Sequence, residues 1–122
     1  MKRSGTINAP ISRKENSIIE RCISDNGQVS ITHYEVLEEK KIKNLPISIV
    51  KCTLETGRTH QIRVHMSYIN HPLLGDDLYG KNTSLINRQA LHSYRISFIH
   101  PVTKQIVNYE APLPNDLLLL KR

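Results

Sequence analysis

The stretch from Thr56 to Met66, TGRTHQIRVHM, holds the densest group of side chains in this sequence that could do chemistry. Arg58, His60, Gln61 and Arg63 supply two guanidinium groups, an imidazole and an amide. Arginine forms paired hydrogen bonds to phosphates and carboxylates, and the imidazole and the amide can donate to a base or a phosphate. This grouping predicts a site that binds an anion or a nucleic acid.

A short helix is expected to position these side chains. It should run from about His60 to Tyr68, with the Thr59 hydroxyl as its N-cap, and end before the sequence Asn-His-Pro at 70–72. The basic side chain of Arg58 lies just ahead of the exposed N–H groups at the helix start, which favours an anion there. One stripe of the helix is apolar and should face the core, and another is polar. The apolar stripe is Ile62, Met66 and Ile69, and the polar face carries His60, Arg63 and Ser67.

Four strands and one more helix are expected around this helix. Apolar and β-branched patterns predict the strands, and Asn115 is expected to cap the last helix. The expected strands are Val29–Leu37, Ile47–Leu54, Tyr94–Ile99 and Gln105–Ala111, and the helix is Asp116–Lys121. Gly5–Arg13 is expected to be a loop-like entry, Lys14–Gly27 a poorly defined polar loop with a turn at Asn26 and Gly27, and Glu38–Asn44 a hairpin-type connection. Gly57, at the turn from strand to helix, is expected to need unusual backbone angles.

The composition is basic, with 17 Lys and Arg against 11 Asp and Glu and a formal net charge of +6. This excess suits a polyanionic partner, although many proteins have basic surfaces without one. One Phe, five Tyr and no Trp argue against an aromatic platform for stacking bases. No apolar run has membrane-spanning length, and residues 1–5 have no apolar core of a signal peptide behind them. Cys22 and Cys52 have no disulfide-framework or metal spacing, so a reducing cytoplasm is expected.

The block at 56–66, followed by His-Pro at 71–72 and GDDLYG at 75–80, closely resembles the third motif of the RluA-type RNA pseudouridine synthases. Further matches follow in the family's order, so the resemblance covers about Gly5 to Leu120. They are RQALH at 88–92, His-Pro at 100–101 and APLPND at 111–116. The resemblance implies an α+β fold: the C-terminal half of the pseudouridine synthase fold, a mostly antiparallel sheet with a central helix packed on it.

The resemblance also implies a chemistry. The family isomerises uridine to pseudouridine, mostly in ribosomal RNA, with one essential Asp and no cofactor or metal. That Asp lies in an H-R-L-D motif, and no R-L-D occurs in these 122 residues. The resemblance therefore implies that residues 1–122 are the C-terminal portion of the catalytic domain, inactive without the half that carries the nucleophile. Asp76 and Asp77, in the third motif, are expected to be turn residues.

Residue roles follow from the resemblance. Arg63 is implied as the partner of the absent catalytic Asp, which it would hold ionised by a forked hydrogen bond. Ile62 is implied in the floor of the base pocket. Residues expected to bind RNA are Arg58, His60, Gln61, Arg88, His92 and Lys51.

A metal site and a non-catalytic module are alternatives to this assignment. His60 and His65 are five residues apart, which does not stack both rings on one side of a helix, so no metal site is predicted. A non-catalytic RNA-binding or interaction module on the same scaffold is the alternative function. A half-domain would expose strand edges and apolar surface, so self-association or marginal stability is also expected.

Overall fold

The computed structural model describes residues 2–81, 83, 85–93, 95–99, 102 and 104–121. The chain forms two compact units, Met1–Gln89 and Ala90–Arg122, and each is described here by itself. The described strands of the first unit are β1 (Ser4–Asn8), β2 (Ile11–Arg13), β3 (Arg21–Ile23), β4 (Ile31–Ile42) and β5 (Leu45–Leu54). Its described helix is α1 (Gln61–Tyr68), and the second unit contains β6 (Arg95–Ile99), β7 (Ile106–Glu110) and α2 (Asn115–Lys121).

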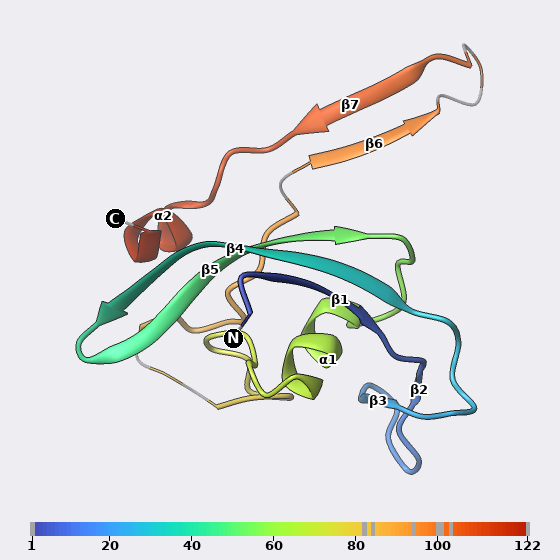
Figure 1. The fold of residues 1–122 in the computed structure, drawn as a ribbon, viewed down its shortest axis with the longest axis horizontal. Helices are drawn as coiled ribbons and strands as arrows, with labels where there is room; N and C mark the ends of the chain where they lie inside the picture. Colours follow the sequence, from blue (N-terminus) through green and yellow to red (C-terminus); the bar gives the residue numbers. More distant parts are fainter. Residues whose placement is uncertain are drawn as a thin grey trace. The chain divides into compact units, whose positions relative to one another are not determined.

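A three-stranded antiparallel sheet in the order β1-β4-β5 forms the frame of the first unit (Figure 1). Its long β4–β5 hairpin turns at Lys43 and Asn44, whose φ angles of 50° and 67° are typical of two-residue hairpin turns. The hairpin-type connection predicted at Glu38–Asn44 is thus confirmed, but the turn is shorter than expected, because β4 continues to Ile42 and β5 begins at Leu45. A register shift between Val36 and Glu38 lets the charged end of β4 continue the ladder.

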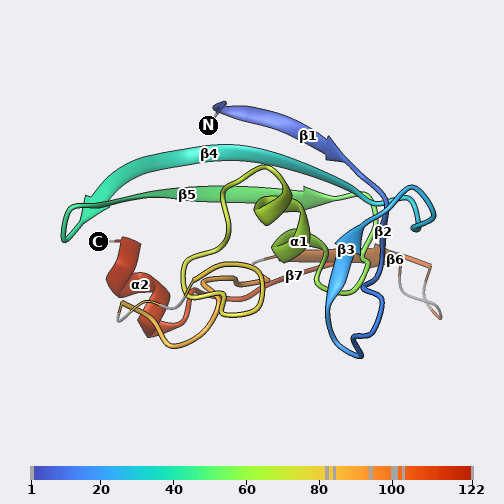
Figure 2. The ribbon, with the colours of Figure 1, turned by 90° about the horizontal axis from the view of Figure 1, so that it is seen from below.

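Helix α1 covers one face of this sheet, as Figure 2 shows. Met66 is buried with Ile7 and Ala9, and Ile62 and Ile69 pack against that cluster. The predicted apolar stripe of the helix is thus confirmed. Burial of such side chains is what stabilises an eight-residue helix that would not persist alone.

A buried histidine joins the helix to the sheet. His65 is fully buried, with Nδ1 2.7 Å from Thr32 Oγ1 on β4 and Nε2 2.9 Å from the carbonyl oxygen of Ala9. Because a carbonyl only accepts, Nε2 carries the ring proton, and Nδ1 accepts from the Thr32 hydroxyl. Burial lowers the pKa of His65, and the bond to Ala9 opposes this only in part. The ring is therefore neutral in the folded protein.

This histidine makes stability depend on pH. The unfolded chain takes up a proton at an ordinary histidine pKa of about 6.5, which the folded state resists, so stability is expected to fall as the pH drops below that value. The free energy of unfolding from urea denaturation should fall between about pH 7.5 and pH 5, by up to about 1.4 kcal/mol per pH unit for each histidine held neutral, and the urea midpoint should fall with it. His71→Gln, at an exposed position, should leave the profile unchanged. Equal urea midpoints at the two pH values would contradict a neutral His65.

The start of α1 differs from the expectation. His60, not Thr59, is the N-cap, with φ 56° and no side-chain cap hydrogen bond. Gly57 has no positive φ, and a Cβ there would meet no atom within 4 Å, so its predicted backbone requirement was wrong. The described glycine that does need a left-handed backbone is Gly75, with φ 76°.

Two stretches predicted to be loops contain strands. Residues 5–13 include most of β1 and all of β2, and residues 14–27 include β3. Strands β2 and β3 pair in a small antiparallel hairpin of their own. These strands are short, so their side-chain alternation is too brief to be recognised in the sequence.

The second unit contains the antiparallel pair β6–β7 and helix α2. Both predicted strands and the terminal helix are present, although Tyr94, the expected first residue of one strand, lies outside the described residues. The mostly antiparallel fold class is confirmed, but the strands are divided among three small sheets rather than joined in one. Among the described helices, neither α1 nor α2 is long and apolar enough to span a membrane.

Candidate active site

The centre of the candidate site is an ion pair between helix α1 and the loop that follows it. Arg63 Nε and Nη2 each donate a 2.9 Å hydrogen bond, to Asp76 Oδ2 and Oδ1 respectively. The Arg63 side chain is 12% exposed and that of Asp76 is 0% exposed. Such a two-pronged bond fixes the plane of the guanidinium as well as its position.

Asp76 also organises its own loop. Its Oδ1 accepts hydrogen bonds from the backbone N–H groups of Leu78 and Tyr79, both at 3.1 Å. Burial by itself would raise the pKa of Asp76, but the bonds from Arg63, Tyr79 and Leu78 outweigh it, and the pKa is lowered. The carboxylate is therefore ionised in the folded protein. The predicted turn role of Asp76 is confirmed, and the ion pair is a second role that the turn pattern did not reveal.

Tyr79 is the residue on which the polar face of α1 converges. Its hydroxyl lies 2.7 Å from His60 Nδ1, its ring lies 5.1 Å from the Arg63 guanidinium carbon, and its carbonyl accepts from Ser67 Oγ at 2.9 Å. The predicted shared face of these three helix residues is thus confirmed. A cation over an aromatic ring is attracted to it, so Tyr79 and Asp76 hold Arg63 from two directions.

His60 is neutral in this arrangement. The Tyr79 hydroxyl accepts from the backbone N–H of Arg21 at 2.9 Å and forms a 2.7 Å hydrogen bond with His60 Nδ1. Burial lowers the pKa of His60, and the positive charges of Arg63 and Arg21 lower it further, against a smaller opposite effect of Asp76. These effects together favour the neutral form of the His60 ring.

Arg63 was expected to pair with a carboxylate outside this chain, and the structure corrects only the implication that it has no such partner within the chain. The guanidinium is already paired with Asp76, which is in the same unit. The described residues provide no hydrogen-bond acceptor for its remaining nitrogen, Nη1. A second carboxylate would therefore meet an arginine that is anchored beforehand.

Gln61 is a further correction. Its side chain is buried, and both amide atoms are fully used. Oε1 accepts from the Thr56 hydroxyl and the Arg58 backbone N–H, and Nε2 donates to the Ile31 carbonyl and the Thr32 hydroxyl. The predicted donor to RNA is instead a clamp between the loop before α1 and strand β4.

The other predicted site residues are spread more widely. Arg58 Nε donates to the Val29 carbonyl at 3.0 Å, and Arg58 lines a hollow together with residues of the β2–β3 hairpin. Ile62 packs in the core cluster, and Arg88 Nη1 donates to the Gln89 carbonyl at 3.2 Å. Lys51 pairs in register with Glu35, so it lies on the sheet face opposite to Thr32 and helix α1. His92 belongs to the second unit, where its Nε2 lies 3.0 Å from the Ala111 carbonyl.

Three residues of this region were missed as site residues in the sequence: Asp76, Tyr79 and Arg21. A signal for two of them was present, because Asp and Tyr stand three apart in GDDLYG, a spacing at which both can face back to one helix. Arg21 had no such signal, since it meets Tyr79 across 58 residues. Within the described parts of the chain, no group of three or more His, Cys, Asp or Glu could hold a metal ion.

Sequence comparison gives a family match over more than half of the chain. The family model for RNA pseudouridylate synthase matches residues 1–68. The Bacillus subtilis protein named uncharacterized RNA pseudouridine synthase YjbO is 52% identical over 113 residues, covering 93% of this chain and 38% of that protein. The ribosomal large subunit pseudouridine synthase D of Nitrosomonas europaea is 39% identical over 129 residues, covering 98% of this chain and 36% of that protein. The chain thus spans less than two fifths of the length of these relatives.

Structural comparison agrees with the sequence match. The structure of human RNA pseudouridylate synthase domain containing 1 has a TM-score of 0.80 and 31% identity, covering 93% of this chain and 49% of that one. The structure of human RNA pseudouridylate synthase domain containing 4 has a TM-score of 0.63 at 22% identity, which supports the fold alone. In both comparisons the chain corresponds to about half of the solved structure.

Proposed function

This chain belongs to the RNA pseudouridylate synthase family and is similar to its RluA-type members, and on that premise we propose that it is the part of such an enzyme that carries the arginine side of the active site. The reaction would be the isomerisation of uridine to pseudouridine in RNA. The names of the relatives that modify the ribosomal large subunit support ribosomal RNA as the substrate. The catalytic aspartate would come from the remainder of a longer protein, because these 122 residues contain no R-L-D sequence.

The observation that carries this proposal is the anchoring of Arg63. Asp76 binds Nε and Nη2, and the ring of Tyr79 lies against the guanidinium. With two of its three nitrogens bound, Arg63 would direct Nη1 at the catalytic carboxylate, hold it ionised and fix its orientation. A preorganised donor of this kind loses no entropy during the reaction and needs no rearrangement.

The other residues have supporting roles in the proposal. A uridine must leave the base stack before its glycosidic bond can be reached, so the site needs contacts for an extruded nucleotide. The neutral His60 would offer its Nε2 atom as a hydrogen-bond partner to the base or the ribose, and Ile62 would support the apolar side of the base pocket. Arg58 would contact the RNA backbone beside them. Arg88, Lys51 and His92 stay assigned to more distant RNA contacts in this proposal.

The proposal is tested by restoring the missing part. A chimera in which this chain replaces the matching segment of Bacillus subtilis YjbO is expected to form pseudouridine in ribosomal RNA, whereas the 122-residue chain alone is expected to form none. Arg63→Lys in the chimera should lower kcat about a hundredfold, because a lysine cannot bind two carboxylates through one planar fork. Because pseudouridine and uridine have the same mass, pseudouridine is measured after digestion of the RNA to nucleosides and chromatographic separation of the two isomers.

The control in the same chimera is Lys41→Gln, which removes a positive charge from the exposed end of β4. It should leave kcat unchanged. An Arg63→Lys chimera as active as its parent would contradict the role of Arg63. Pseudouridine formation by the chain alone would show that no second part is needed.

A further inference from the structure

The β2–β3 hairpin and the loop before α1 enclose a basic hollow of about 350 Å³. Three of the residues that line it are arginines and none is acidic. The full lining is Ile11, Ser12, Arg13, Arg21, Asn26, Gly27, Gln28, Arg58 and Thr59. We propose that this hollow binds a backbone phosphate of the RNA substrate, next to the nucleotide that reacts, an inference that rests on the function proposed above.

The pairing of the hairpin is the first argument. Arg13 and Arg21 are direct partners in the antiparallel register of β2 and β3. Directly opposed residues lie on the same face of a strand pair, and like charges in that position repel and destabilise it. Arg21 Nη1 also donates long hydrogen bonds of 3.3–3.4 Å to the carbonyl oxygens of Ile18, Ile19 and Glu20, which leave its positive charge unneutralised. A bound anion shared by Arg13 and Arg21 would turn their repulsion into attraction. The pair is thus unfavourable for the free hairpin and favourable for a phosphate complex.

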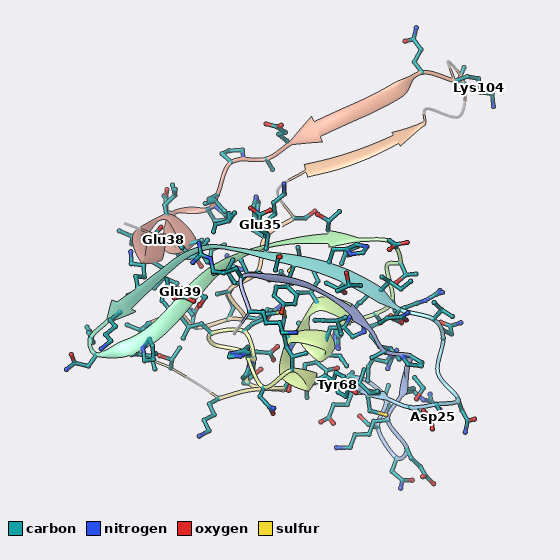
Figure 3. The ribbon with its side chains drawn as sticks, in the orientation of Figure 1. Asp25, Glu35, Glu38, Glu39, Tyr68 and Lys104 are labelled. Carbon is teal, nitrogen blue, oxygen red and sulfur yellow. The ribbon has the colours of Figure 1, made fainter. Side chains whose placement is uncertain are left out.

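The nearby carboxylates do not neutralise these arginines. Glu20, next to Arg21, is engaged by Lys14 Nζ at 2.8 Å. Asp25 is exposed and is not among the residues that line the hollow, and Figure 3 labels it beside the connection that leads from β3 to β4. Among the lining residues, the side chains of Ser12, Asn26, Gln28 and Thr59 add neutral polar groups that suit a phosphodiester.

The wall of the hollow is fixed before any ligand arrives. Ile11 and Gln28 exchange two backbone hydrogen bonds, of 3.0 and 2.8 Å. Gly27 lies so close to this strand that an added Cβ would be 2.6 Å from the backbone carbon of Ile11. Arg58 is held by its bond to the Val29 carbonyl. A preorganised site of this kind loses little entropy when a ligand binds.

The hollow is connected to the candidate active site. The backbone N–H of Arg21 donates to the Tyr79 hydroxyl at 2.9 Å, and the Tyr79 ring lies 5.1 Å from the Arg63 guanidinium carbon. A phosphate held by Arg13, Arg21 and Arg58 would therefore lie beside the reacting nucleotide. This placement favours a nucleotide adjacent to the target uridine over a distant part of the RNA.

Binding of a fluorescein-labelled single-stranded RNA to the 122-residue chain, measured by anisotropy over a salt series, tests the inference. Arg13→Gln and Arg21→Gln should each weaken binding about tenfold, the effect of one lost charge-assisted contact. Each should also reduce the slope of log K against log salt by about 0.7. The matched control is Lys41→Gln, which removes the same charge from the β4–β5 hairpin and should keep the parent slope.

A second measurement separates binding from folding. Because Arg13 and Arg21 repel each other, the unfolding temperature of Arg13→Gln without RNA should equal or exceed that of the parent, while its RNA affinity falls. The inference would be overturned if both arginine variants had the same slope of log K against log salt as the parent chain. It would also be overturned if the parent chain did not bind the RNA. The proposed function is judged separately, by pseudouridine formation in the chimera, which these binding results do not decide.

Discussion

Asp76→Asn is expected to lower the free energy of unfolding by about 3–5 kcal/mol, the usual loss when one member of a buried ion pair is removed. The Arg63 side chain is only 12% exposed, so without Asp76 its charge remains largely buried and unpaired. Asparagine keeps an oxygen that can accept from the backbone N–H groups of Leu78 and Tyr79. The loss of stability therefore measures the missing ion pair with Arg63 rather than a disrupted turn. Urea denaturation of the 122-residue chain measures the effect.

The neighbouring residue provides the control. Asp77 is exposed, so Asp77→Asn removes the same charge one residue away and should change stability by no more than about 0.5 kcal/mol. The pKa of Asp76 is lowered by folding, so its stabilisation is present above the unfolded value and is lost as the pH falls through the folded one. In Asp76→Asn the free energy of unfolding should therefore decrease less steeply at acidic pH than in the parent chain. Equal losses in the two variants would show that the ion pair is not buried in solution.

Gly75→Ala is expected to destabilise the chain by at least about 3 kcal/mol. A φ angle of 76° is strained for alanine, and its Cβ would lie 2.1 Å from the Arg88 carbonyl oxygen and 2.8 Å from Ile86 Cγ2. The loop would have to move, and it carries Asp76 at the next position. Loss of the Arg63 ion pair should therefore accompany the loss of stability, as seen by urea denaturation and by the NMR signal of Arg63 Nε–H.

Gly57→Ala is the matched control. At Gly57 an added Cβ meets nothing within 4 Å, and φ is not positive. Alanine there should be neutral or should stabilise the chain by up to about 1 kcal/mol, because it restricts the unfolded state. If both glycine variants were tolerated equally, the tight approach of Gly75 to Arg88 would be refuted.

Local patterns predicted the parts of this fold that depend on local interactions. The periodicity of α1 identified both its core stripe and the face shared by His60, Arg63 and Ser67, since side chains three and four residues apart on a helix must lie together. The long strands β4 and β5 were recognised by their β-branched residues. The mostly antiparallel fold class was confirmed as well.

Tertiary contacts decided what the sequence patterns could not. Asp76 has a good turn sequence around it, and nothing local shows that its carboxylate also reaches back 13 residues to Arg63. Gln61 has the composition of an RNA contact, but two strand residues, Ile31 and Thr32, use its amide nitrogen. Thr59 has the right residue type for a cap, yet the left-handed backbone of His60 turns the chain without it.

The shared hydroxyl of Tyr79 makes two distant segments one cooperative unit. It bonds at once to the backbone of strand β3 and to the histidine that begins α1. Fraying of the short β2–β3 hairpin would break the hydrogen bond between the Arg21 backbone and Tyr79. The Tyr79 ring, and the Arg63 guanidinium that lies against it, would then be less restrained. Local opening of the β2–β3 hairpin and loss of order at the Arg63 guanidinium are therefore expected to be coupled.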